Sequence, residues 1–262
     1  MVSNPASERD RYVPPERYEQ LLDVLEHRRA VRGFQDRPVE PEKIEQVLEA
    51  ARWAPSGANA QPWEFIVVTD EDDIRQIGDA YIHEYDEKYQ ESTPDFPVDN
   101  KRWQREVPCY IVALGDRRIR EAYPSADIPG EERANVQTYQ HSLGDAIYAI
   151  WLAATTLGLS TTEATCYSSH EAVIRELLAV PENYDIVATL PLGYPLRYQE
   201  TRYRRPTEEF VHYGSYDQAR YRDDEELDAW LDQVKRSRYR GDGELISRED
   251  LDHAEATRRD RE

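Results

Sequence analysis

Apolar residues recur at helical spacing in five parts of the chain, separated by polar or proline-containing turns. The first of these parts follows Pro14 and Pro15, and proline favours the first turn of a helix. Short continuous apolar runs such as 65–68 lie between the periodic parts and are typical of buried strands. The pattern predicts helices at 16–28, 41–53, 71–90, 136–157 and 169–179, and strands at 64–69, 109–115, 160–165 and 185–192.

The two ends of the chain differ in composition from the middle. Residues 1–14 are mostly polar, which predicts a flexible N-terminal tail. After about residue 216 the chain is highly charged, and we expect one helix at 223–235 with a narrow apolar stripe, which favours packing against a partner surface. We divide the chain into the tail (1–14), a folded domain (15–215) and a charged, partly helical C-terminal extension (216–262).

Three arginines, Arg28, Arg29 and Arg32, follow the first predicted helix within five residues. Guanidinium groups bind phosphate through planar, bidentate hydrogen bonds, so the cluster is a candidate anion site. The alternative is structural, because cations at a helix C-terminus offset the helix dipole and short arginine runs are usually solvated. Taken alone, the run favours the structural interpretation.

A tight turn is predicted at Pro55, Ser56, Gly57 and Asn59, between a helix and a buried strand. Such a turn can present backbone amides and short polar side chains to a ligand. Ser56 and Asn59 can instead bond to nearby backbone and stabilise the loop. A threonine-rich run at 160–165 is equally compatible with simple strand propensity.

Four segments occur in a characteristic order: HRRAVRGF at 27–34, RWAPSGANAQPWEFIVV at 52–68, LPLGYP at 190–195 and RYRRPTEEFV at 202–211. Together they resemble the FMN-dependent nitroreductase family over roughly residues 15–213. The resemblance implies an α+β fold in which a mostly antiparallel central sheet is flanked by helices. It also implies an intertwined homodimer with FMN in the interface between the subunits, so that 15–215 is the FMN-binding domain.

The resemblance assigns one group of residues to the FMN phosphate and ribityl chain. This chain has Ala30 where the family often has serine, so one hydroxyl contact is absent and must be replaced by backbone or water. A late basic residue, Arg204, matches the family position that closes on the same phosphate, and its neighbours are weaker candidates. The group consists of Arg28, Arg29, Ala30, Arg32, Arg202, Arg204 and Arg205.

A second group matches the family's contacts to the flavin ring. Pro55, Ser56 and Asn59 correspond to the turn that contacts the isoalloxazine or ribityl, and the last two are also candidates for loop stabilisation. The segment 157–168 corresponds to the part of the family that passes the flavin N5 edge. There Thr165 is the candidate hydrogen-bond donor to N5, and Glu163 and Ala164 offer backbone groups.

The activity implied by the resemblance is an FMN-dependent oxidoreductase. NAD(P)H would deliver hydride to FMN N5, and an acceptor such as a nitroaromatic or quinone would then take the electrons. No acidic or basic side chain is needed, so we assign no catalytic residue. The six histidines lie without a metal-binding or triad pattern, and His27 is expected to be a helix-end cation.

Two alternatives remain open. The Thr-rich segment is closer to the deiodinase-like branch, which would make the protein a reductive dehalogenase. In that branch a lid carries Glu, Tyr and Lys; this chain has Glu84, Tyr85, Lys88 and Lys101, but their spacing departs from the pattern. The other alternative is a protein that stores or senses FMN without efficient turnover.

Charge restricts the possible partners. The net charge is −20, with 53 acidic and 33 basic residues, of which only four are lysine. Nucleic acids and anionic membranes both require a cationic surface, so neither is expected as a partner. The excess of carboxylates is spread along the chain and spares the candidate site segments. This distribution predicts an acidic surface adapted to concentrated salt, as in a halophilic cytoplasm.

Other features favour a cytoplasmic protein without a metal. Residues 1–20 are polar and do not resemble a signal peptide, and the apolar run 146–159 is too short to span a bilayer. That run is expected to form a buried central helix. Cys109 and Cys166 are expected to be reduced core thiols. A calcium loop ending in GDGELISRED is excluded, because Arg238 and Arg240 occupy positions that need oxygen ligands.

Overall fold

The computed structural model describes residues 14–88, 103–123, 128–130, 132–166, 168–197 and 204–239. For Pro15, 84–88, Thr165, Ser168, Ser169 and 232–239 it describes the backbone only. The chain forms two compact units, Met1–Leu196 and Arg197–Glu262, which we describe separately. The predicted tail, apart from Pro14, lies outside the described residues, as do Lys101 and Arg202.

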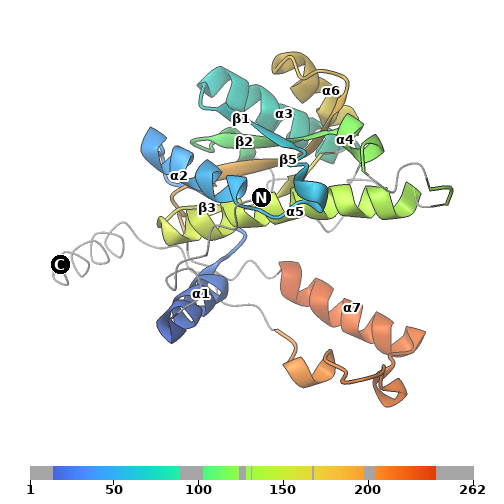
Figure 1. Cartoon of the computed structure of the whole chain (residues 1–262). Helices are drawn as coiled ribbons and strands as arrows, with labels where there is room; N and C mark the ends of the chain where they lie inside the picture. Colours follow the sequence, from blue (N-terminus) through green and yellow to red (C-terminus); the bar gives the residue numbers. More distant parts are fainter. Residues whose placement is uncertain are drawn as a thin grey trace. The chain divides into compact units, whose positions relative to one another are not determined.

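The first unit contains six α-helices, a 3₁₀ turn at Gly57–Asn59 and five strands among the described residues (Figure 1). Proline occupies the first turn of both α1 and α2, which the sequence pattern predicted for α1. The helices are α1 (Pro15–His27), α2 (Pro41–Arg52), α3 (Glu71–Lys88), α4 (Arg117–Glu121), α5 (Glu132–Thr156) and α6 (Ser168–Leu177). The strands are β1 (Trp63–Val68), β2 (Tyr110–Asp116), β3 (Ser160–Thr161), β4 (Ala164–Thr165) and β5 (Tyr184–Gly193).

The strands form one antiparallel sheet in the order β1-β2-β5-β3, with β4 also paired to β5. Helices α2 and α5 cover one face of the sheet, and α3 and α6 cover the other (Figure 1). This arrangement confirms the predicted α+β fold with an antiparallel central sheet flanked by helices.

Strand β2 shows why the sheet is buried on both faces. Ile111 and Ala113 pack into the core formed with α2 and α5, whereas Val112 and Leu114 pack into the core formed with α3 and α6. Side chains alternate between faces along a strand, so a strand covered on both sides is apolar throughout. The continuous apolar run in the sequence is the result.

One predicted strand, 160–165, is interrupted. Its two halves, β3 and β4, keep the same register against β5, since Thr161 pairs with Leu192 and Ala164 with Thr189. That register places Thr162 opposite Pro191, which has no N–H to donate to the ladder. The prediction of one continuous strand was therefore wrong at 162–163, and the proline on the partner strand is the physical cause.

Helix α5 is the predicted central helix, but it begins at Glu132 rather than at 136. Its first turn is polar, so hydrophobic periodicity could not reveal it, although Glu132 is favourable near a helix N-terminus. The short helix α4 was not predicted; the Asp116 carboxylate caps it by accepting a hydrogen bond from the Arg118 N–H at 3.0 Å.

The second unit is described for residues 204–239. It contains two 3₁₀ turns, Thr207–Glu209 and Gln218–Arg220, and helix α7 (Asp224–Tyr239). Asp223 and Glu226 form a reciprocal capping box at the start of α7, with N–H to carboxylate distances of 2.9 and 3.2 Å. The predicted helix at 223–235 is confirmed. None of the helices in the described parts of either unit is long and apolar enough to cross a bilayer.

Candidate functional site

The arginine segment lies beside the threonine-rich strand. After α1 ends, Ala30 forms a parallel bridge with Thr161, and the Val31 N–H donates to the Thr161 carbonyl at 3.3 Å. Phe34 forms a further bridge with Pro195, two residues beyond the end of β5. The fold therefore brings together two candidate segments, 28–32 and 161–165, which are far apart in the sequence.

The three arginines of this segment have different surroundings. The Arg28 guanidinium is half-buried and lies 4.6 Å from the centre of the Trp151 ring on α5. Arg29 donates to the carbonyls of Glu26 and Arg28, the latter at 2.8 Å, and so caps the end of α1. This capping is the structural role that the sequence also allowed. Arg32 is exposed.

His27 ends α1 as expected, and its Nδ1 lies 2.8 Å from the Asp23 carbonyl oxygen. In the neighbouring segment 161–164, every residue except Glu163 is buried. Thr161 and Thr162 are 2% and 3% exposed, so their side chains belong to the interior. Glu163 is exposed, although partial desolvation of its carboxylate raises its pKa. The Ala164 carbonyl accepts a hydrogen bond from Tyr81 on α3, which sequence analysis had not singled out.

The predicted turn at 55–59 has an unusual backbone. Ala58, Asn59 and Gln61 have φ angles of 52°, 56° and 47°, in the left-handed region that residues other than glycine rarely adopt. The Ser56 hydroxyl accepts from the Gln61 N–H at 3.0 Å, which confirms its loop-stabilising role. Strained turns of this kind persist where surrounding packing holds them and are common at ligand sites.

Gly57 anchors this turn to α5. Its N–H donates to the Ser142 hydroxyl at 3.1 Å, and a β-carbon built on Gly57 would lie 2.2 Å from the Thr138 methyl. No larger residue fits there without displacing the turn. Pro55 and Asn59 remain exposed to solvent.

Helix α5 separates the two halves of the candidate site. The arginine segment contacts it at Trp151, whereas the 55–59 turn contacts it at Thr138 and Ser142. Nine to thirteen residues of helix correspond to about 14–20 Å. Within one chain the structure therefore does not bring the turn to the arginine segment.

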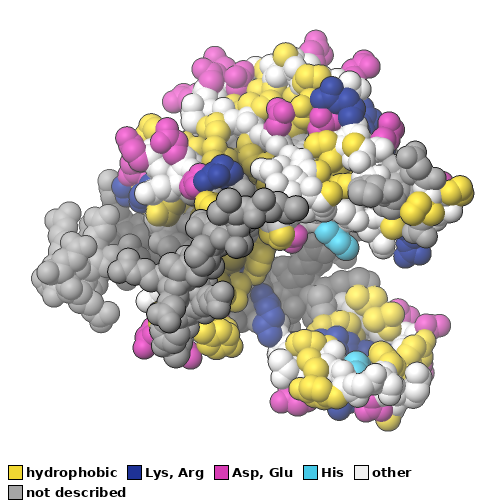
Figure 2. Space-filling view, viewed as in Figure 1, with side chains coloured by type: hydrophobic (Ala, Val, Ile, Leu, Met, Phe, Trp, Pro, Cys, Tyr) yellow, Lys and Arg dark blue, Asp and Glu magenta, His cyan; other side chains and the backbone are white. Residues whose placement is uncertain are grey.

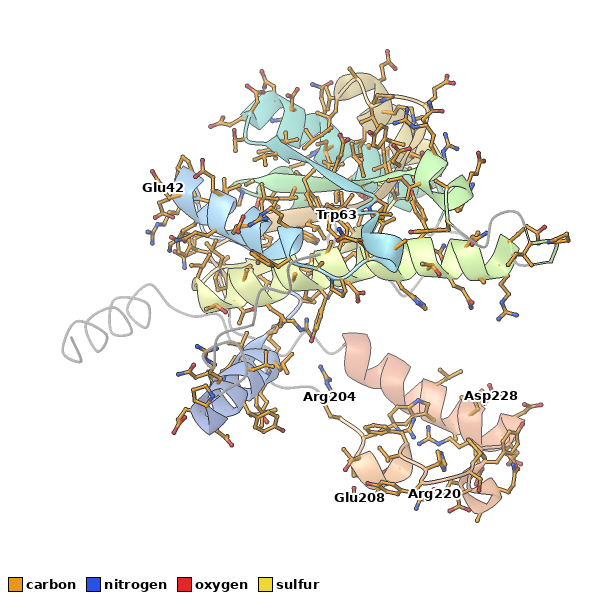
Figure 3. All side chains as sticks on the ribbon, in the orientation of Figure 1. Glu42, Trp63, Arg204, Glu208, Arg220 and Asp228 are labelled. Carbon is orange, nitrogen blue, oxygen red and sulfur yellow. The ribbon has the colours of Figure 1, made fainter. Side chains whose placement is uncertain are left out.

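Two of the late arginines are described, both in the second unit. Arg205 pairs with Glu209, with 3.2 Å between Nε and Oε2, and its guanidinium lies 5.6 Å from the Phe210 ring centre. Arg204 is exposed and, like Glu208 and Arg220, belongs to this unit (Figure 3). Because the units are described separately, the shared phosphate contact of Arg204 and Arg28 stays a prediction.

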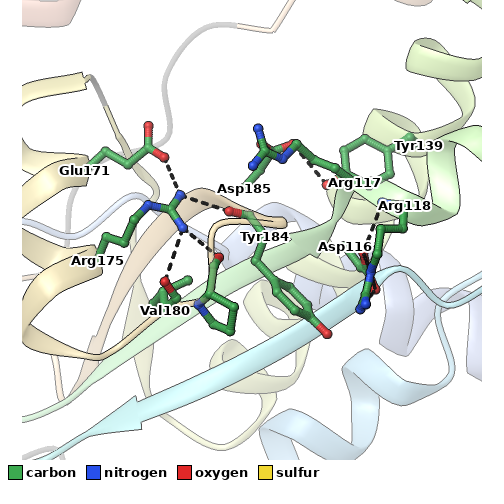
Figure 4. A network of polar contacts seen from close by, with 10 residues as sticks. Asp116, Arg117, Arg118, Tyr139, Glu171, Arg175, Val180, Tyr184 and Asp185 are labelled. Carbon is green, nitrogen blue, oxygen red and sulfur yellow. Dashed lines mark hydrogen bonds and ion pairs between the residues drawn. The ribbon is translucent and has the colours of Figure 1, made fainter.

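Other charged clusters of the first unit are structural. Arg175 joins α6 to the start of β5, with bonds to the Glu171 carboxylate at 2.7 Å and the Tyr184 carbonyl at 2.9 Å (Figure 4). Nearby, the Tyr139 hydroxyl donates to Asp185 at 3.1 Å, and burial raises the pKa of Tyr139. These contacts hold the start of β5, at Tyr184 and Asp185, against α6 and α5.

A cavity of about 910 Å³ opens between α2, the start of α3 and residues 105–108. Its lining combines apolar residues with three arginines and four acidic residues, and none of the predicted site residues is among them; the charged residues are Arg37, Arg75, Arg105, Asp36, Glu45, Glu71 and Glu106. Acidic side chains gather over α2 and α3 on the face shown in Figure 2. The exposed acidic residues of these helices include Glu42 and Glu71. Among the described residues, no cluster of His, Cys, Asp or Glu could hold a metal ion.

The chemistry of the arginine segment fits an anionic group. It combines guanidinium groups with an extended backbone lying against β3, and the adjacent β4 supplies further backbone groups. Neither cysteine forms a disulfide. Cys109 is fully buried, as expected for a core thiol, whereas Cys166 is half-buried.

Comparison with known proteins places this arrangement in context. Residues 25–194 match the model of the Nitroreductase family. An iodotyrosine deiodinase from Haliscomenobacter hydrossis is 32% identical over 184 residues, which cover 67% of this chain and 79% of the relative. A nitrobenzene nitroreductase from Ectopseudomonas oleovorans is 29% identical over 198 residues, covering 66% of this chain and 85% of the relative.

The fold also matches solved structures. The NADPH:FMN oxidoreductase from Vibrio harveyi, solved in complex with NAD+, superposes with a TM-score of 0.62. The match covers 83% of this chain and 85% of that chain at 18% identity, so it shows a common fold.

Proposed function

The chain belongs to the nitroreductase family of oxidoreductases, and we propose that it uses FMN to carry electrons from NAD(P)H to a nitroaromatic, quinone or similar acceptor. The observation that carries this proposal is the bridge between Ala30 and Thr161. This bridge places guanidinium groups that can bind a phosphate beside a strand edge that can contact a flavin ring. A nitrobenzene nitroreductase among the relatives supports the acceptor class.

The residues present fit this cofactor. In the proposal, Arg28 and Arg32 bind the phosphate, with Arg204 as a further contact, and the backbone at Ala30 lies along the ribityl chain. The Glu163–Thr165 segment faces the ring edge. Arg29 mainly holds the end of α1 in place. When bound, FMN supplies the redox chemistry, and the protein supplies binding, orientation and control of access.

We further propose that the active unit is a homodimer. The turn at 55–59 and the arginine segment lie about 14–20 Å apart along α5, so one chain does not offer both to the same end of a cofactor. A second copy can supply the missing half. Exposed apolar side chains support this proposal, among them Leu21 (48%), Trp53 (73%) and Tyr148 (46%).

Complementation tests the shared site. A dimer formed from one Arg28→Ala chain and one Asn59→Ala chain would contain one intact site if each site draws on both chains. Flavin content of the mixed dimer should then reach half that of the wild type, while both variant homodimers stay low. Low content in the mixed dimer as well would show that each site is built within one chain.

A spectroscopic experiment tests the activity. The protein is purified in high salt, its visible spectrum is recorded, and NADH or NADPH is added without oxygen. A flavin spectrum that bleaches supports the reductase, after which nitroaromatic and quinone acceptors are compared. A flavin spectrum that resists both nucleotides favours a storage or sensing protein, and absence of flavin binding after FMN addition contradicts the site.

A reductive dehalogenase is the second candidate, because an iodotyrosine deiodinase is among the relatives at 32% identity. Halotyrosine turnover with dithionite or NAD(P)H, lost in a Thr165→Ala variant, would support it. The side chains of Glu84, Tyr85 and Lys88, and all of Lys101, lie outside what the structure describes.

We propose a cytoplasm with concentrated salt as the setting. The net charge of −20 and the acidic surface of α2 and α3 support this proposal (Figure 2). High salt weakens steering of NAD(P)H by distant charges, so recognition then depends on local contacts.

A further inference from the structure

Tyr81 on α3 connects three elements through one hydroxyl group. Its oxygen lies 2.8 Å from the Thr189 hydroxyl on β5, 3.3 Å from the Ala164 carbonyl on β4 and 3.3 Å from the Cys166 sulfur. The Tyr81 ring also packs on His170 of α6, with 4.1 Å between ring centres. Strand β4 is only two residues long and pairs with β5, and Tyr81 adds a side-chain contact to that pairing.

The Ala164 carbonyl has no hydrogen, so Tyr81 is the donor in that contact. When the one hydroxyl hydrogen of Tyr81 is directed to Ala164, the Thr189 hydroxyl donates to the Tyr81 oxygen. Burial raises the pKa of Tyr81 well above its usual value, so its hydroxyl remains protonated and able to donate. Both side chains are enclosed, at 5% exposure for Tyr81 and 0% for Thr189.

The register of the sheet shows which way the β4 backbone faces. The Leu192 N–H donates toward β2, to the Cys109 carbonyl. Along an inner strand, the backbone groups of successive residues bond alternately to the strand on one side and to the strand on the other. Thr189 is three residues from Leu192, so its backbone groups face β4, where it pairs with Ala164. The backbone groups of Ala164 are thus directed toward β5, and those of Thr165 are directed to the outer edge of β4.

Ala164 and Thr165 share a peptide plane. The carbonyl of Ala164 and the N–H of Thr165 point in opposite directions because that plane is rigid. Pairing with β5 and the Tyr81 hydroxyl both hold the Ala164 carbonyl, and together they fix the direction of the Thr165 N–H at the outer edge of the strand.

We propose that Tyr81 is a positioning residue, whose hydroxyl holds the Ala164–Thr165 peptide so that the Thr165 N–H faces the flavin N5 position. This inference rests on the proposed function. An N–H group donates well to N5 of the oxidised flavin, which has an in-plane lone pair, and poorly to N5 of the reduced flavin, which is a weaker acceptor and carries a hydrogen of its own. Releasing the peptide should therefore weaken binding of oxidised FMN more than binding of reduced FMN.

The test is the midpoint potential of FMN bound to Tyr81→Phe, which lacks only the hydroxyl oxygen and its hydrogen. We expect a tenfold change in the ratio of the two affinities, which raises the potential by about 30 mV for a two-electron couple. Tyr110→Phe is the matched control. Tyr110 is also fully buried in the same core, and its hydroxyl donates to the Gln104 carbonyl at 2.8 Å instead.

The outcomes separate this inference from the function it rests on. Bound FMN with an unchanged potential in Tyr81→Phe overturns the role of Tyr81 and leaves the oxidoreductase standing. An equal shift in Tyr110→Phe also overturns it, because any lost core hydroxyl would then suffice. A wild-type protein that binds no FMN refutes both proposals.

A second variant covers the case in which Tyr81→Phe does not fold. Thr189→Val removes the hydroxyl that donates to Tyr81 and preserves the shape of the side chain. We expect a smaller rise in potential, because the Tyr81 hydroxyl keeps its place but loses the donor that directs its hydrogen to Ala164. An unchanged potential in folded Thr189→Val would count against the proposal.

Discussion

Replacing Arg28 by alanine tests the proposed phosphate site most directly. Hydrogen bonds to a charged group contribute about 1.5–3 kcal/mol, so we expect the Kd for FMN to rise about 10- to 150-fold. The same change removes the stacking of the guanidinium on Trp151, which lies 4.6 Å away, and this contact contributes about 0.5–1 kcal/mol to folding. The binding defect should therefore clearly exceed the stability defect.

Two measurements separate these effects. Fluorescence titration of the apoprotein with FMN gives the Kd, and thermal unfolding without FMN gives the stability. Arg75→Ala is the control for charge, because Arg75 lies on the surface of α3 and pairs with Asp72 at 2.8 Å. Arg29→Ala is the control for position. Since Arg29 caps α1, we expect it to lower stability more than FMN affinity.

Unchanged FMN affinity in Arg28→Ala would show that the phosphate lies elsewhere. An equal loss of affinity in Arg75→Ala would show that the net charge of the protein, and not a contact at the site, determines binding.

Three further predictions concern stability. Gly57→Ala should destabilise the protein by about 1–3 kcal/mol, because its methyl would overlap the Thr138 side chain. Gly144→Ala is the matched control, because Gly144 is exposed on α5 and no atom lies near the added methyl, so this variant should be neutral or more stable than the wild type. Equal thermal shifts in the two variants would contradict the packing argument. The Glu40 carboxylate accepts a hydrogen bond from Tyr194 at 2.6 Å, which lowers its pKa from 4.5 to about 2. Its stabilising contribution is therefore complete above pH 4.5 and is lost as the pH falls toward 2, so urea midpoints should depend less on pH in Glu40→Gln. Finally, the acidic surface predicts loss of fold and flavin without molar KCl, and equal retention with and without KCl would refute a halophilic adaptation.

Local patterns predicted much of the fold. Prolines at the start of α1 and α2, apolar stripes on α2 and α5, and the apolar runs of β2 and β5 each depend on neighbouring residues, so a single sequence reveals them. The interruption between β3 and β4 depends on Pro191, which is distant in the chain and becomes relevant only once the register is known.

The candidate site shows the same division. The sequence by itself identified the arginine cluster, the turn at 55–59 and the threonine-rich segment, because each is a short run of unusual residues. The packing of distant segments, which no short run of residues contains, puts Ala30 against Thr161, makes Arg29 a helix cap, and places the turn at a different part of α5. Tyr81 was missed because the apolar spacing along α3 predicts only that its side chain is buried. The spacing does not show which groups form hydrogen bonds with its hydroxyl. Pairing between distant segments is set by the packing of the whole core, which no local pattern contains.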